Sequence, residues 1–238
     1  MMSEKPPIDL VFITWPNHPA RMKYFRATLE SLHKHLTASR HTIRWKCSAE
    51  SEHDPKYWWC GDELERICRG EGIDLFWRAA PASPGGNLNT AYRLAEDLLV
   101  PHQDDWKLKE PLDLSEAADV LGEFPEFEMV RFAFPVRPDH KRGTRLTGGV
   151  GRFRVVDPQG PWPYGDEPKL TRRSFLDKWG PFLESRRHSQ EPDMEQRLAS
   201  GNARILATPT PIYDHFGDVC SLIEEPYNRR VSRSDYRD

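Results

Sequence analysis

The chain has 238 residues, of which 37% are hydrophobic and 30% are charged, and its 34 basic and 37 acidic side chains leave a formal net charge of −3. This near balance of charge argues against a protein built mainly to hold nucleic acid, and the sequence contains no apolar run long enough to span a bilayer. We therefore expect a single domain over residues 1–238, located in the cytoplasm.

Strands and helices alternate through the first part of the chain. Residues 8–14 form an apolar run typical of a buried strand, Asn17 or His18 can cap a helix with Pro19 in its first turn, and apolar residues then recur every three or four positions from Met22 to Leu36. Further strands are expected at 42–47, 73–77 and from residue 98, with a polar turn through Ser48 and Glu50, a helix over 55–69, a flexible loop over 81–87 and a helix from Leu88. This alternation predicts a largely parallel sheet with helices on both faces.

Two adjacent acids, Asp104 and Asp105, follow the strand that begins at Leu98. Two neighbouring carboxylates repel each other unless a cation lies beside them, and Mg²⁺ or Mn²⁺ takes its ligands from one or two carboxylates, waters and substrate phosphates. Adjacent acids are also common on solvated loops. In a parallel sheet, however, ligands bind outside the carboxyl ends of the strands, where Thr14, Glu50 and the acid pair are expected to gather.

The pattern changes after residue 110. A short helix is expected over 114–121, a strand over 127–134, a glycine-containing hairpin over 145–156 and a helix over 171–179. A polar helix beginning at about Glu191 and ending at Gly201, strand-like pieces at 205–207 and 211–213, and a charged, mobile tail complete the chain.

The order of these features resembles the GT-A fold of glycosyltransferases, and family 2 in particular, over about residues 8–217. The features are a first strand ending in Thr14, a second ending near Glu50, a Gly/Asn-containing loop and helix, a strand leading to Asp104-Asp105-Trp106, and a late acidic helix start. The resemblance implies a nucleotide-sugar-binding half over 1–110, an acceptor-binding half over 111–221 and a mobile tail over 222–238.

The family pattern assigns donor and metal roles residue by residue. Thr14 and Glu50 match positions that contact the nucleotide, and Asn89 falls within the donor-side helix. Asp104 and Asp105 match the acidic motif that holds a divalent metal on the donor diphosphate, and His215 resembles the late histidine that completes the metal site. An Asp-x-Asp motif would place its first acid at Gln103, which can bind a hydroxyl group but carries no charge. An ordinary capping or core histidine is the alternative for His215.

Direct displacement at the anomeric carbon also needs a base for the acceptor hydroxyl. Asp193 is the best match to the family's base motif, and Glu191 is the alternative because Pro192 stands where a second acid is commoner. Acids at a helix start also complement its dipole without doing chemistry.

The resemblance therefore implies an inverting, metal-dependent glycosyltransferase of the hexosyltransferase type. It would use Mn²⁺ or Mg²⁺ and a UDP- or GDP-sugar donor, and an acceptor with a free hydroxyl, a saccharide in preference to a nucleic acid. Two alternatives stay open. A non-catalytic GT-A-like module would bind sugar or nucleotide without turnover, and a nucleotidyltransferase would usually carry a basic, glycine-rich phosphate loop after the first strand, which residues 15–19 lack.

Overall fold

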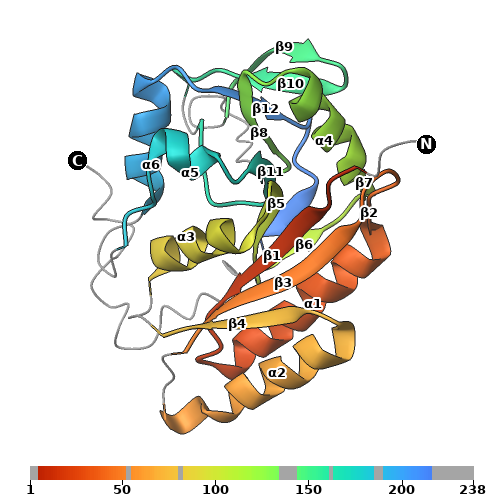
Figure 1. Cartoon of the computed structure of the whole chain (residues 1–238), viewed down its shortest axis with the longest axis vertical. Coiled ribbons are helices and arrows are strands. Elements are labelled where there is room, and N and C mark those ends of the chain that lie inside the picture. Colours follow the sequence, from red (N-terminus) through yellow and green to blue (C-terminus); the bar gives the residue numbers. More distant parts are fainter. Residues whose placement is uncertain are drawn as a thin grey trace.

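The computed structural model describes residues 5–51, 55–79, 83–133, 144–160, 163–184 and 190–215. In this part of the chain, one sheet joins strands from both halves of the sequence (Figure 1). Its strands, in spatial order, are β4 (Asp74–Arg78), β3 (Ile43–Glu50), β1 (Ile8–Thr14), β5 (Leu98–Gln103), β11 (Lys169–Arg172), β8 (Phe127–Arg131), β12 (Arg204–Ala207), β10 (Phe153–Val156) and β9 (Leu146–Val150). Only β11 and β10 run against the other strands of this sheet. The α/β fold with a mostly parallel central sheet is confirmed.

Helices cover both faces of the sheet (Figure 1). All residues of β1 are buried, because successive side chains of a central strand point to opposite, covered faces. One face packs on α1 (Pro19–His35), α2 (Trp59–Glu71) and α4 (Leu114–Glu123), and the other on α3 (Pro84–Leu94), α5 (Phe175–Trp179) and α6 (Gln190–Ser200). His18 caps α1 as expected, since its Nδ1 accepts a hydrogen bond from the backbone N–H of Ala20 at 3.1 Å.

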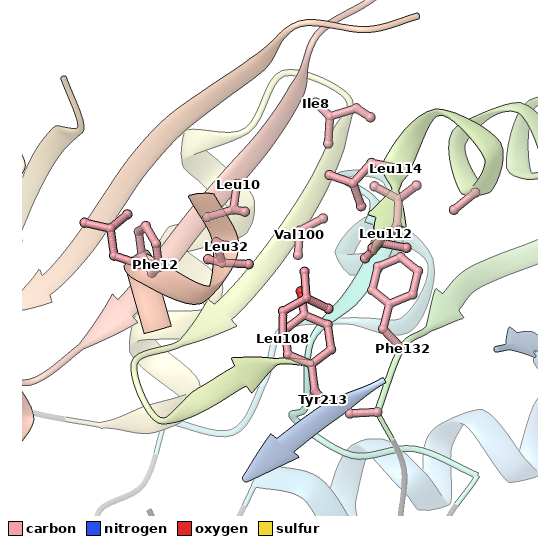
Figure 2. Close-up of a cluster of buried hydrophobic side chains, with 14 of the residues drawn as sticks. Ile8, Leu10, Phe12, Leu32, Val100, Leu108, Leu112, Leu114, Phe132 and Tyr213 are labelled. Carbon is pink, nitrogen blue, oxygen red and sulfur yellow. The ribbon is translucent and has the colours of Figure 1, made fainter. Parts of the chain in front are cut away.

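Two short ribbons connect the halves of the chain beside the main sheet. β6 (Trp106–Leu108) pairs with β13 (Tyr213–His215), and β2 (Leu36–Thr37) pairs with β7 (Leu112–Asp113). Figure 2 shows Leu108, Leu112 and Tyr213 in the same hydrophobic cluster as Ile8 and Val100. Burial of this cluster fixes the β6–β13 ribbon against the carboxyl end of β5, where the acid pair lies. None of the helices in the described part of the chain has the length and apolar character to cross a membrane.

Several expected boundaries were wrong. Ser48 and Glu50 belong to β3 and not to a turn, because Ser48 pairs with both β1 and β4 and Glu50 pairs with Arg78 of β4. The expected loop over 81–87 becomes helical from Pro84, since the Ser83 side chain accepts from the backbone N–H of Gly86 and caps the helix. The expected helix over 171–179 begins as strand β11 and becomes helical only at Phe175.

Other expectations were right or fall outside the described ranges. The hairpin over 145–156 and the helix from Leu114 are confirmed, whereas the last strand is Tyr213–His215 and not 211–213. The helix over 55–69 divides into η1 (Pro55–Tyr57) and α2, which ends at Gly72 in a left-handed conformation with φ 67°. Phe134 and the charged tail lie outside the described residues.

Candidate functional site

The carboxyl ends of β1, β3 and β5 meet at one edge of the sheet. In the strand register, Ile13 lies opposite Gln103 and Thr14 lies opposite Ala49. This pairing brings Thr14, Glu50 and the turn after Gln103 to the same edge, as the sequence predicted. β5 itself ends at Gln103, and Asp104 and Asp105 occupy the turn that leads into β6.

Asp104 is almost fully buried and its side chain is engaged from two sides. Its Oδ2 accepts a hydrogen bond from the Thr14 hydroxyl at 2.5 Å, and its Oδ1 accepts one from Nη1 of Arg21 at 2.8 Å. The Thr28 hydroxyl donates to the Asp104 backbone carbonyl at 2.9 Å. Burial raises the pKa of Asp104 to about 6, although the Arg21 charge acts in the opposite direction.

Asp105 is also buried, but its two oxygens differ. Its Oδ2 lies 3.2 Å from Nη1 of Arg21 and 3.3 Å from Nε2 of His215. Its Oδ1 is buried and has no hydrogen-bond partner among the described residues. Burial alone would raise the pKa of Asp105, but the contact with His215 and the charge of Arg21 outweigh it and hold the pKa below its ordinary value.

His215 reaches Asp105 through the β6–β13 ribbon. In the ribbon's register, His215 lies opposite Trp106, and the two rings stack with centroids 4.6 Å apart. The neighbouring Asp214 pairs with Lys109 at the surface. Backbone pairing therefore brings a histidine from the end of the described chain beside the acid motif.

Arg21 is the residue that sequence reasoning missed at this site. Its Nη1 lies between Asp104 and Asp105, and a cation does therefore stand beside the two acids. The signal was present in the sequence, because Arg21 and Thr28 are seven residues apart in the first helix and therefore share a face. Since Thr28 contacts the turn as well, that face of α1 supports the acid pair.

The residues at this edge fit a divalent cation in part. No three acidic, histidine or cysteine side chains among the described residues are arranged as ligands of one ion. However, Asp105 offers a buried oxygen that has no partner in the described part of the chain, and His215 adjoins its other oxygen. Mg²⁺ sites commonly use only one or two carboxylates and complete the shell with waters and substrate phosphates, so Asp105, His215 and Asp104 could hold such an ion.

Glu50 and Asn89 take part in a second polar network beside the acid pair. Glu50 is buried and pairs with Arg78 at 3.0 Å, and Arg78 also binds Glu184 at 3.0 Å. The Asn89 amide donates to Phe182 and Glu184 and accepts from the Phe182 backbone N–H at 2.8 Å. Asn89 thus holds the segment at Phe182–Glu184 against the sheet edge directly, and Glu50 does so through Arg78.

Gln103 lies half-buried next to the acid pair. Its side-chain oxygen accepts a long hydrogen bond, 3.4 Å, from the Trp106 indole. Its backbone carbonyl accepts from Nδ1 of His102, which is fully buried, and burial lowers the pKa of His102 to about 4. A neutral imidazole therefore supports the backbone at the end of β5.

The two candidate bases face different surroundings. Glu191 accepts a hydrogen bond from the backbone N–H of Asp166 at 2.7 Å, whereas Asp193 is 45% exposed and pairs with Arg197 one turn later on α6. Glu191 lies three residues before the buried Met194, so it shares the inward side of the helix. Asp193 instead borders a shallow surface hollow lined by Trp179 and Arg197.

Asp166, whose backbone N–H donates to Glu191, precedes β11 and lies at the same edge of the sheet as the acid pair. β11 runs antiparallel to β5 and β8, so its first residue, Lys169, lies at their carboxyl ends, opposite Arg131. Burial lowers the pKa of Lys169 to about 8, and the charges of Asp166 and Glu191 oppose that shift. The edge therefore carries a second charged group, in which Arg131, Asp166, Glu167 and Lys169 are buried and Glu191 is partly exposed.

No protein-family model matches the sequence, and no curated protein matches it either. Solved structures do match. GalNAc-T7 with UDP, GalNAc and Mn²⁺ has a TM-score of 0.63 at 10% identity, covering 88% of this chain and 43% of that chain. TarS from S. aureus, a fragment in complex with UDP, has a TM-score of 0.61 at 18% identity, covering 87% and 59%.

A nucleotidyltransferase is similar as well. CMP:2-keto-3-deoxy-manno-octonic acid synthetase complexed with CTP has a TM-score of 0.53 at 13% identity, covering 85% of this chain and 88% of that one. The chain spans only 36% of a longer TarS structure. At these identities the matches show the fold, which is that of GT-A-type glycosyltransferases.

Proposed function

We propose that this chain is a glycosyltransferase that moves a sugar from a nucleoside-diphosphate-sugar to an acceptor hydroxyl with the aid of a divalent metal ion. The observation that carries the proposal is Asp105. Its buried carboxylate has one oxygen without a partner among the described residues and the other beside His215, at the ligand-binding edge of a GT-A-type sheet. Buried polar atoms are nearly always hydrogen-bonded or ligated, so an unpartnered carboxylate oxygen points to a cation.

Asp105 and His215, with Asp104 behind them, would hold Mn²⁺ or Mg²⁺. The ion would neutralise charge on the diphosphate leaving group. Thr14 and Thr28 keep the Asp104 side chain and backbone in place through their hydroxyl groups. The chain's own contribution at this edge is therefore a carboxylate, Asp104, that is held in place beside Asp105.

The nucleotide side of the site is assigned to residues 1–110. Gln103 stands beside Trp106, where its amide can bind a ribose or sugar hydroxyl. Thr14, Glu50 and Asn89 would support the site by positioning other groups. The Glu50 side chain holds Arg78 and the Ser83 backbone, and the Asn89 side chain holds the segment at Phe182–Glu184. Residues 111–221 would bind the acceptor.

Glu191 is the stronger candidate for the base, and this reverses the order that the sequence suggested. Glu191 is tied to the Asp166 backbone at the carboxyl edge of the sheet, whereas Asp193 is engaged by Arg197. A carboxylate at this edge could take the proton from an acceptor hydroxyl as the bond to the anomeric carbon forms. Attack from the face opposite the leaving diphosphate inverts the anomeric centre.

The similarity to the CTP-bound synthetase supports a second candidate, nucleotidyl transfer to a sugar. That reaction consumes a nucleoside triphosphate and releases pyrophosphate. The described loop between β1 and α1 offers Trp15, Pro16 and Asn17 in place of a basic, glycine-rich phosphate loop, which favours the glycosyltransferase.

The test is release of nucleotide from a panel of UDP- and GDP-sugars with Mn²⁺, Mg²⁺ or EDTA. We expect slow formation of UDP or GDP that stops with EDTA and in Asp105→Asn. Asp214→Asn is the matched control, because Asp214 is exposed on the neighbouring ribbon and pairs only with Lys109 among the described contacts. Pyrophosphate release from CTP with a sugar, and no release from nucleotide-sugars, would favour the synthetase instead.

A further inference from the structure

Arg21 holds the position between the acids that a bridging metal ion would need. One nitrogen, Nη1, contacts Asp104 Oδ1 at 2.8 Å and Asp105 Oδ2 at 3.2 Å. The other Asp104 oxygen is taken by the Thr14 hydroxyl. A cation that uses Asp104 must therefore displace either the Thr14 hydroxyl or Arg21.

Asp105 Oδ1 is the remaining point of entry. It is buried and has no hydrogen-bond partner among the described residues. A metal bound there would adjoin the guanidinium on the neighbouring Oδ2, and the two positive charges would repel each other in a poorly solvated site. Because arginine stays protonated, this repulsion is relieved only when the Arg21 side chain moves away.

We propose that Arg21 is the resident counter-ion of the Asp104–Asp105 pair and competes with the divalent metal for these carboxylates. The inference rests on the proposed function for its biological meaning. The guanidinium neutralises the two buried acids in the metal-free protein and withdraws when the ion binds. Arg21 is thus a positioning residue. The apparent affinity for metal equals the intrinsic affinity multiplied by the fraction of molecules in which Arg21 leaves the acid pair uncovered.

The side chain is suited to this exchange. It extends from the first turns of α1 and is 31% exposed, so it can turn outward without disturbing the core. Asp104 is held by Thr14 and by the backbone contact with Thr28, and it keeps its place when the guanidinium leaves.

The test measures binding of Mn²⁺ alone, by electron paramagnetic resonance of the free ion, without any nucleotide. Arg21→Met removes the charge and keeps most of the side-chain length, and it should bind Mn²⁺ about ten- to a hundredfold more tightly than the wild type. Arg21→Lys keeps the charge and should stay close to the wild type. Arg26→Met is the matched control, since Arg26 lies on the same helix, is itself exposed and pairs with Glu63, away from the acid pair.

Thermal unfolding with and without Mn²⁺ covers the case of a destabilised variant. Without metal, Arg21→Met leaves two buried acids uncompensated and should melt lower than the wild type, and Mn²⁺ should raise its melting temperature by more than it raises that of the wild type. The gain should disappear when Asp105→Asn is added.

Equal or weaker Mn²⁺ binding in Arg21→Met, or a gain that survives Asp105→Asn, would overturn the inference. UDP and GDP are titrated separately. A failure of both nucleotides to bind, together with the expected metal result, would count against the glycosyltransferase and not against the role of Arg21.

Discussion

Replacing the two candidate bases, Glu191 and Asp193, one at a time separates an effect on the chemical step from an effect on helix stability. Glu191→Gln keeps an oxygen that accepts the 2.7 Å hydrogen bond from the Asp166 backbone, so the variant loses a charge and little structure. Loss of a general base lowers turnover by about 10²- to 10⁴-fold. We expect a fall of that size in the rate constant for sugar transfer, with little change in KM for the donor.

Asp193→Asn should behave differently. Asp193 is 45% exposed and forms an i,i+4 pair with Arg197, an interaction that contributes about 0.3–0.5 kcal/mol to stability. Arg197 also donates to the carbonyls of Trp179 and Pro181, and these bonds remain in the variant. Turnover should therefore change by no more than about twofold, the factor that corresponds to half a kcal/mol.

The assay is single-turnover transfer, measured by nucleotide release in the presence of an acceptor from a saccharide panel. Thermal unfolding of each variant checks that the fold is retained. A large fall in Asp193→Asn with a near-normal Glu191→Gln would refute the argument from geometry and restore the order that the sequence suggested.

Three further predictions concern the scaffold of the site. Asp9 is fully buried against Arg44 and Lys46, and its pKa is lowered because hydrogen bonds from Arg44, Glu96 and Lys46 outweigh the effect of burial. The ionised Asp9 therefore stabilises the fold fully above about pH 4, and this stabilisation is lost as pH falls through the folded-state pKa. In urea unfolding, Asp9→Asn should cost about 3 kcal/mol at pH 7 and less at pH 3, and an equal cost at both pH values would contradict this. Gly86→Ala would place a Cβ 2.2 Å from Nη2 of Arg78 and should destabilise by about 1–3 kcal/mol, whereas the control Gly122→Ala meets nothing within 4 Å and should be neutral or slightly stabilising in the same measurement. Thr28→Val keeps the shape of the side chain but removes the donor to the carbonyls of Asp104 and Trp106, so it should lower the free energy of unfolding by about 1–3 kcal/mol and weaken nucleotide binding. An unchanged nucleotide affinity in calorimetry would argue against a supporting role for this face of α1.

The parallel half of the sheet could be predicted from sequence because its signals are local. The apolar run at β1 coincides with the observed strand, and the periodic apolar residues from Met22 onward lie on the buried side of α1. The placement of Thr14 near Asp104 then follows from the rule that parallel strands present their carboxyl ends at one edge.

The errors arose where tertiary contacts decide the local structure. Two glycines predicted a loop at residues 85–86, but a Cβ at Gly85 would lie 2.2 Å from the Leu183 backbone carbonyl, so the close approach of that segment requires glycine there, and Ser83 caps the helix. Residues 171–172 read as helical, but pairing with β5 and β8 makes them a strand. Sequence spacing alone gives no information on such contacts.

The roles of Arg21 and Glu191 depend on tertiary contacts as well. The sequence places Arg21 on the same face of the first helix as Thr28, but its contact with the acid pair depends on where that face of α1 meets the turn after β5. Glu191 was ranked below Asp193 by motif similarity, and only the hydrogen bond with Asp166, from a segment 25 residues earlier, distinguishes the two.

Calorimetric titration of UDP and GDP, with Mn²⁺ and with EDTA, tests the central claim most directly. The account predicts that at least one of the two diphosphates binds with Mn²⁺, that EDTA or Asp105→Asn weakens this binding by about tenfold or more, and that Asp214→Asn leaves it unchanged. Binding of neither diphosphate in the presence of Mn²⁺, or binding that is indifferent to both EDTA and Asp105→Asn, would contradict a metal-dependent nucleotide-sugar site at this edge of the sheet.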